Sequence, residues 1–157
     1  MTKTRLAVVL PAAALISSAC MALAGQTVEN SGHIVCATDK WDEKELGKGQ
    51  KIVDASSRCV LIPDDSTAPK LTDACAGKYE YLADGSWKAK GTCTETYPGG
   101  DKIFLDWEEG SHLSDYTWTN TGGTGKYDGA SGSGTYKYEN LTDTLVAGRY
   151  KGKLTLP

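Results

Sequence analysis

The densest group of ionisable side chains in this sequence lies between positions 106 and 115 and could support metal binding or acid–base catalysis. The group consists of Asp106, Glu108, Glu109, His112 and Asp115. A metal ion would need two or three of these ligands to converge, and a catalytic acid or base would need surroundings that shift its pKa. Positions 108–114, however, are typical of a hairpin turn, in which charged side chains are solvated. We therefore expect no metal, no cofactor and no catalytic residue here.

A run of glycines between positions 121 and 138 is the second candidate for chemistry, because glycine-rich loops can hold phosphate groups. The phosphate-loop motif must open a helix, whereas Lys126 is followed by Tyr127 and Asp128, which disfavour one. The dinucleotide motif G-x-G-x-x-G fails by one position, since the glycine after Gly125 is Gly129. Glycine at this density instead predicts a tight turn that leads into a sharply bent strand. The glycines assigned to this structural turn are Gly122, Gly123, Gly125, Gly129, Gly132 and Gly134.

The N-terminus has the pattern of an export signal. Lys3 and Arg5 precede an apolar run over 6–16, and small residues at 22 and 24 predict cleavage after Ala24. Residues 1–24 would then be a signal peptide and 25–157 a single domain in the periplasm or outside the cell. A lipid anchor on Cys20 is the less favoured alternative, because Ser17 stands where leucine is usual. Nothing here predicts a membrane span.

Charge excludes two classes of partner. Cleavage after Ala24 would remove Lys3 and Arg5 and would change the formal net charge from −3 to −5. A mildly acidic chain without a basic cluster argues against nucleic acid and against anionic membrane surfaces.

Four cysteines remain after the predicted cleavage, and an even count in an exported protein predicts two disulfides. They are Cys36, Cys59, Cys75 and Cys93. No C-x-x-C pair is present, which disfavours a zinc site, and no G-x-S-x-G motif suggests a nucleophilic serine. Positions 79–82 and 86–89 flank a turn at 83–85, and this hairpin register sets Cys75 opposite Cys93. We therefore predict Cys75–Cys93, which leaves Cys36–Cys59.

The chain as a whole predicts an all-β fold, because turn signals separate about eight short strands and no long segment keeps a helical period. The strands are expected at 32–37, 50–62, 75–82, 86–96, 102–108, 114–120, 133–139 and 145–156. Residues 40–46 form the best helix candidate, 26–32 are expected to be a loose lead, and 64–70 a surface loop. Closure removes exposed strand edges, so a small closed antiparallel barrel is favoured over a sandwich.

Alternation along these strands collects aromatic side chains on shared faces. Such faces could line a cavity for an apolar ligand, or they could fill a solid interior, which is the somewhat stronger expectation for so small a barrel. The residues we assign to ligand binding are Tyr79, Tyr81, Trp87, Trp107, Trp118 and Tyr150.

The segment Gly-Gly-Thr-Gly-Lys-Tyr-Asp-Gly-Ala-Ser-Gly-Ser-Gly at 122–134 resembles the motif of the allene oxide cyclase and dirigent superfamily. The members of that superfamily are calycin-like barrels of eight strands that carry such a motif between late strands. The resemblance implies a barrel that binds small apolar molecules or steers their cyclisation, often as a homo-oligomer. No segment here matches the catalytic positions of the cyclases, so catalytic residues stay unassigned.

Three functions follow, and a binding protein is favoured over an enzyme. The leading one is an exported barrel that binds a small hydrophobic molecule in its interior or at its mouth. The second is an isomerase or cyclase that uses an interior carboxylate or Arg149. The third is a protein-binding or inhibitor module that uses the outer surface of the barrel.

Overall fold

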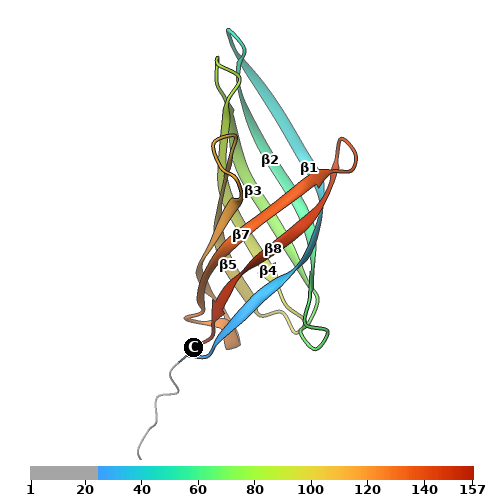
Figure 1. Cartoon of the computed structure of the whole chain (residues 1–157), viewed down its shortest axis with the longest axis vertical. Helices are drawn as coiled ribbons and strands as arrows, with labels where there is room; N and C mark the ends of the chain where they lie inside the picture. The colour runs from blue at the N-terminus through green and yellow to red at the C-terminus, as the bar shows by residue number, and fades with distance from the viewer. Residues whose placement is uncertain (1–24) are drawn as a thin grey trace, which may run out of the picture.

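The computed structural model describes residues 25–157, which form a closed barrel of eight antiparallel strands in sequential order (Figure 1). The predicted signal peptide, its cleavage site and Cys20 lie outside the described residues. Among the described residues, no helix is long and apolar enough to cross a membrane. The strands are β1 (Thr27–Gly47), β2 (Gln50–Pro63), β3 (Leu71–Tyr81), β4 (Trp87–Thr96), β5 (Lys102–Gly110), β6 (Tyr116–Gly123), β7 (Ser131–Asn140) and β8 (Leu145–Thr155).

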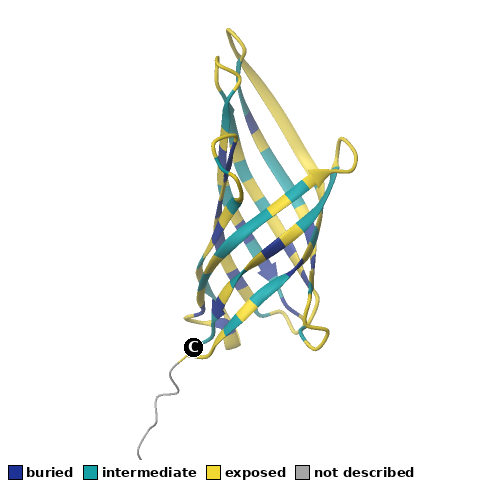
Figure 2. Cartoon of the chain, in the orientation of Figure 1, coloured by how far each residue is buried: buried dark blue, intermediate teal, exposed yellow. Residues whose placement is uncertain are grey.

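The predicted all-β barrel is therefore confirmed. Each strand pairs with the next, and β1 closes the barrel against β8, from Thr27 opposite Thr155 to Ala37 opposite Leu145. Burial alternates along the strands, as Figure 2 shows, because successive side chains point to opposite faces of the wall. In β5, for example, Ile103 and Leu105 are buried while the residues between and beside them are exposed.

Two predictions about the first part of the chain are wrong. Residues 40–46 are no helix, and residues 27–32 are no loose lead, because both belong to the long strand β1. The second half of β1 pairs with β2, for example Lys40 with Ser56 and Glu45 with Lys51. Strand pairing with a β-branched partner segment at 52–53 overrides the weak helical tendency of this charged stretch.

The hairpin turns after β1, β3, β5 and β7 lie at one end of the barrel, which we call the turn end. Figure 1 shows the β1–β2 hairpin rising past the β7–β8 turn. Pairing between β1 and β8 stops at Ala37 opposite Leu145, and one further backbone hydrogen bond runs from the N–H of Thr38 to the carbonyl oxygen of Thr144. Beyond Thr38, β1 pairs with β2. The wall of the barrel is thus lower on the side of the β7–β8 turn.

The opposite end, which we call the closed end, is filled by packed side chains. It carries a short 3-10 helix η1 (Gly125–Tyr127), whose Tyr127 ring lies 4.1 Å from the ring of Tyr97. The core here also contains Leu61, Leu71 and Ile103, of which Ile103 is fully buried.

The glycine run divides between a turn and two strands, with Gly122 and Gly123 at the end of β6. Gly125 and Gly129 adopt positive φ angles of 60° and 84°, which favour glycine, in the connection between β6 and β7. Gly132 and Gly134 instead lie within β7. A Cβ at Gly134 would clash with the backbone oxygen of Lys151 and would stand 2.6 Å from Cζ2 of Trp118, so this glycine allows close approach of both β8 and an inward-pointing indole.

Both predicted disulfides are present. Cys36–Cys59 joins β1 to β2, and Cys75–Cys93 joins β3 to β4. The hairpin register is the predicted one, with Tyr81 opposite Trp87 and Cys75 opposite Cys93.

Candidate functional site

A cavity of about 880 Å³ occupies the barrel interior and reaches the turn end. All four tryptophans of the chain, Trp41, Trp87, Trp107 and Trp118, line it. Thr38 of β1 and Thr144 of the β7–β8 turn line it on the side where the wall is lower. A space of this size falls within the range of small-molecule sites in proteins.

The six residues assigned to ligand binding all line this cavity, and their contact with a ligand stays a prediction. Trp107, Trp118 and Tyr150 are buried in the wall, whereas the others are half-buried nearer the turn end. The ring of Tyr79 lies 5.9 Å from those of Trp87 and Trp107, so the aromatic faces are continuous. The expectation of a solid interior is wrong for this end of the barrel.

Glu109, which the sequence analysis assigned to a solvated turn, is a functional candidate of the cavity. It is only 4% exposed, and its carboxylate accepts hydrogen bonds from three tyrosines of the cavity wall. The hydroxyls of Tyr136 and Tyr138 each donate over 2.7 Å, and that of Tyr79 donates over 3.3 Å. Burial raises the pKa of Glu109, and the three hydroxyl donors oppose this rise because they stabilise the charged form.

The signal for Glu109 was present in the alternation of β5. Ile103, Leu105 and Trp107 point inward, and Glu109 is the next residue of the same face. We placed positions 108–114 in a solvated turn, and this is wrong for Glu109, because β5 continues to Gly110.

The rest of the ionisable group lies on the outside and does not converge with Glu109. Asp106, Glu108, His112 and Asp115 are all exposed. Asp106 and Glu108 border a shallow hollow of about 930 Å³ on the outer face, where lysines and carboxylates alternate.

Arg149, named above as a possible catalytic group, also lies outside. It is exposed, donates to Nε2 of His33 over 2.7 Å and pairs with Asp64 at 2.6 Å. Its neighbour Tyr150 points inward, so alternation turns Arg149 outward. A direct role for Arg149 in the cavity is therefore wrong.

A second pair of carboxyl groups lies deeper in the cavity. Asp73 of β3 and Glu95 of β4 are direct partners in the strand pairing, and they are 5% and 6% exposed. Burial raises the pKa of Asp73 to about 7. Burial, together with the nearby charge of Asp73, raises the pKa of Glu95 to about 8. Among residues 25–157, one tyrosine hydroxyl, that of Tyr97, donates to this pair, over 3.2 Å to Glu95.

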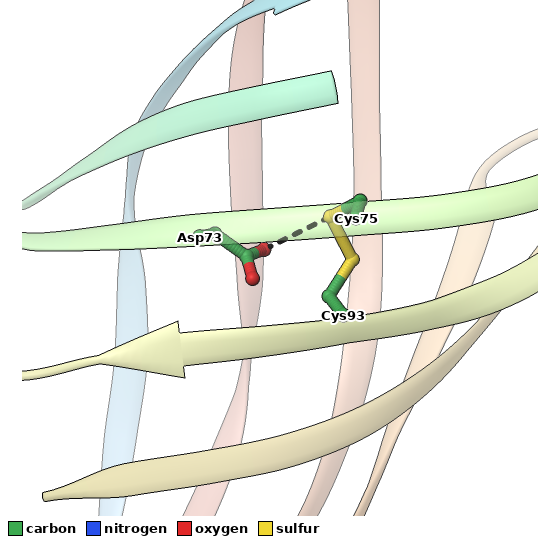
Figure 3. A group of neighbouring side chains, drawn as sticks. All are labelled: Asp73, Cys75 and Cys93. Carbon is green, nitrogen blue, oxygen red and sulfur yellow. Dashed lines mark hydrogen bonds between the residues drawn. A yellow bond between two sulfur atoms is a disulfide. The ribbon is translucent and has the colours of Figure 1, made fainter. Parts of the chain in front are cut away.

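Asp73 also contacts the Cys75–Cys93 disulfide (Figure 3). Its Oδ2 lies 3.3 Å from Sγ of Cys75. A disulfide sulfur carries no proton, so this contact is a hydrogen bond only when Asp73 is protonated and donates. The three residues lie close enough together to resemble metal ligands, but the disulfide uses both sulfurs, so no thiolate pair can hold an ion.

Three buried polar atoms that belong to cavity-lining residues have no hydrogen-bond partner within the described part of the chain. They are Oδ1 of Asp73, Nε1 of Trp107 and the hydroxyl of Tyr150. Buried polar groups are nearly always hydrogen-bonded, so these atoms mark places where a ligand or a bound water would be held.

No protein-family model matches the chain, and no curated protein matches it. Several solved structures, however, have a similar fold. The pterocarpan synthase dirigent protein GePTS1 is 9% identical with a TM-score of 0.57, over 92% of this chain and 97% of that one. The related PsPTS1 is 9% identical with a TM-score of 0.55, over 83% and 96% of the two chains.

A protein of unknown function from the DUF3224 family of Shewanella oneidensis is also similar. It is 9% identical with a TM-score of 0.59, over 84% of this chain and 98% of that one. These similarities concern the fold, which is the dirigent and allene oxide cyclase-like barrel that the resemblance at 122–134 implied.

Proposed function

We propose that the protein binds a small, largely apolar molecule inside the barrel. The observation that carries this proposal is the cavity of about 880 Å³, which reaches the turn end and is lined by all four tryptophans. Aromatic walls supply most of the binding free energy through burial of apolar surface. The unpartnered atoms of Trp107, Tyr150 and Asp73 would orient the ligand by hydrogen bonds.

Tryptophan fluorescence tests the proposal directly, because every tryptophan of the chain faces the cavity. The protein would be titrated with a panel of lipids and aromatic compounds. We expect at least one class to change the emission with a Kd below roughly 100 μM. A panel without such a compound contradicts the proposal.

A pair of neighbouring substitutions separates binding inside the barrel from binding outside. Thr38 lines the cavity, whereas Ala37 is exposed on the outer face of the same strand. Thr38→Phe should weaken binding at least tenfold by occupying the space, and Ala37→Phe should leave it unchanged. Equal effects of the two variants would place the ligand elsewhere.

Native mass spectrometry identifies the natural ligand. Protein purified from the envelope fraction of its own host should carry an extra mass that is lost on denaturation. If every preparation showed only the mass of the polypeptide, that would count against a tightly bound ligand and would favour a function of the outer surface.

We further propose that the protein is exported and cleaved after Ala24. The two disulfides support this, because disulfides persist in the periplasm and outside the cell but are rare in the cytosol. Mass determination of the mature chain tests it. A mature N-terminus at Gln26 or later, or a lipid on Cys20, would contradict the proposed cleavage.

One observation favours an isomerase or cyclase as the second candidate. Asp73 and Glu95 face the cavity, and burial raises their pKa values to about 7 and about 8, near the range useful for proton transfer. If the protein turns over its ligand, Asp73→Asn with Glu95→Gln should abolish turnover and keep binding. Turnover that survives both substitutions would exclude these carboxyls as the acid or base.

A further inference from the structure

Acidic side chains dominate the ionisable lining of the cavity. Five carboxylic acids line it, three buried in the wall and two exposed at the turn end. They are Asp73, Glu95, Glu109, Glu139 and Asp143. No lysine, arginine or histidine is among the lining residues of this cavity in the described part of the chain. Lys51, which lies over the ring of Tyr81 at the turn end, is paired with Glu43 at 3.0 Å.

The surroundings of Glu109 are arranged for its charged form. Three hydroxyls from Tyr79, Tyr136 and Tyr138 converge on its two oxygens. A carboxylate can accept from all three donors at once, whereas a protonated acid would have to direct its own O–H at one of the tyrosines or leave it unpaired. A buried carboxylate of this kind is stable when a positive charge lies nearby.

Aromatic rings surround the space next to Glu109. The ring of Tyr79 lies 5.1 Å from that of Trp41, and Tyr116 lies 6.0 Å from Trp87 and 5.3 Å from Tyr138. The faces of such rings carry negative electrostatic potential and attract cations. The rim already shows the interaction, with Nζ of Lys51 placed 4.8 Å from the centre of the Tyr81 ring.

These observations favour a cation without N–H groups. The oxygens of Glu109 already accept three hydrogen bonds, which leaves room for at most about one of the three N–H groups of a primary ammonium, and aromatic faces are poor acceptors for the others. A quaternary ammonium has no N–H and is the type of cation that aromatic cages recognise.

We propose that the ligand is an organic cation with a quaternary ammonium group, which binds between Glu109 and the rings of Tyr79, Trp87 and Tyr116. Its apolar body contacts Trp107 and Trp118 deeper in the cavity. Glu139 and Asp143 at the turn end attract it electrostatically. This inference rests on the proposed function, because it specifies the ligand class of the same cavity.

Two probes of nearly equal shape test the inference. Phenyltrimethylammonium and tert-butylbenzene differ by a charged nitrogen in place of a carbon, and both are followed by tryptophan fluorescence on the disulfide-bonded protein. We expect the cation to bind at least about tenfold more tightly, as a desolvated cation–π contact predicts. The comparison needs no substitution, so it stands even if a variant fails to fold.

A matched pair of variants assigns the effect to Glu109. Glu109→Gln removes the inward charge, and Glu108→Gln removes an equal charge from the exposed face of the same strand. Glu109→Gln should weaken binding of the cation about tenfold and leave that of tert-butylbenzene unchanged, whereas Glu108→Gln should change either by less than about twofold.

Equal affinity for the two probes, or tighter binding of the neutral one, overturns the inference and leaves the proposed function standing. Equal effects of Glu109→Gln on both probes overturn the assignment of the charge to Glu109. If neither probe binds below about 1 mM, the inference falls, and the wider panel described above decides whether the proposed function falls with it.

Discussion

Both ends of the barrel interior contain buried carboxyl groups and tyrosine hydroxyls that donate to them, but the ratio of donors to carboxyls differs. Near the turn end, one carboxyl, that of Glu109, accepts hydrogen bonds from three tyrosines. Toward the closed end, two carboxyls, those of Asp73 and Glu95, share one tyrosine donor. Donors stabilise a buried charge and burial opposes it. The first arrangement therefore favours a carboxylate, whereas the second favours protons held at neutral pH.

The largest expected effect is on the pH dependence of stability, and it tests whether Asp73 and Glu95 are protonated in the native state. The native state binds protons on Asp73 and Glu95 up to about pH 7 and about pH 8, while the unfolded chain releases them near pH 4. The native state thus binds more protons over this window, so the free energy of unfolding should fall as the pH rises from about 4 to about 8. One pKa unit corresponds to about 1.4 kcal/mol, so the total fall should be several kcal/mol.

Urea unfolding at a series of pH values measures this fall. Asp73→Asn with Glu95→Gln should flatten most of it, since neutral amides do not titrate, and the remaining slope should come from Glu109, whose pKa burial also raises. Asp106→Asn with Glu108→Gln is the matched control, because both residues are exposed. An unchanged slope in the inner double variant would show that the pair is not protonated in the native state.

A second prediction concerns the packing that leaves room for the cavity. Trp118 lies over the backbone of β7 and β8, where a Cβ at Gly134 would stand 2.6 Å from its indole. Gly134→Ala should therefore cost about 1–3 kcal/mol of unfolding free energy by overpacking. Gly85→Ala is an unsuitable control because of its positive φ, so an exposed strand position such as Ser133→Ala serves. Equal stabilities of the two variants would contradict the close approach.

The sequence predicts a feature of either end only where the residues that determine it lie close together in the chain. The β3–β4 hairpin register follows from a three-residue turn, and it correctly places Cys75 opposite Cys93. The same register also places Asp73 opposite Glu95 on the inner face, so the sequence contains this second consequence as well. Glu109 was missed because strand ends are poorly marked, although it continues the inward face of β5.

Strand β1 could not be predicted in full for a different reason. Its first residue, Thr27, pairs with Thr155 at the other end of the chain, so no local pattern reports the contact. Its second half is charged on both faces, and pairing with β2 decides its conformation. The cavity likewise depends on how eight strands close, and the aromatic pattern alone fits a solid interior equally well.

A third and smaller effect tests the tyrosine donors of Glu109. Tyr138→Phe removes one donor at 2.7 Å. Tyr116→Phe is the control, because the Tyr116 hydroxyl does not donate to Glu109. Hydrogen bonds to charged groups contribute about 1.5–3 kcal/mol, so Tyr138→Phe should destabilise the protein by about that amount at pH 8.

The sign of the pH dependence distinguishes this effect from lost packing. Loss of a donor to the carboxylate raises the pKa of Glu109 further, so the cost should be largest where Glu109 is charged and should shrink toward pH 4, where it is protonated in both states. A cost that is the same at both pH values would mean that Glu109 is neutral throughout. That result would also remove the basis for a cation next to it.

The smallest expected effect concerns the outer surface, where a carboxylate has a basic partner instead of tyrosines. Arg149 pairs with Asp64 at 2.6 Å and contacts His33, but these side chains are largely exposed. Exposed ion pairs contribute about 0–1 kcal/mol, so Arg149→Ala should change stability by less than about 1 kcal/mol. Because Arg149 points away from the cavity, the substitution should leave ligand affinity unchanged, as titration by tryptophan fluorescence would show. A large loss of affinity would mean that the β8 outer face takes part in binding, and the contrast between a neutralised exterior and an acidic interior would no longer explain ligand choice.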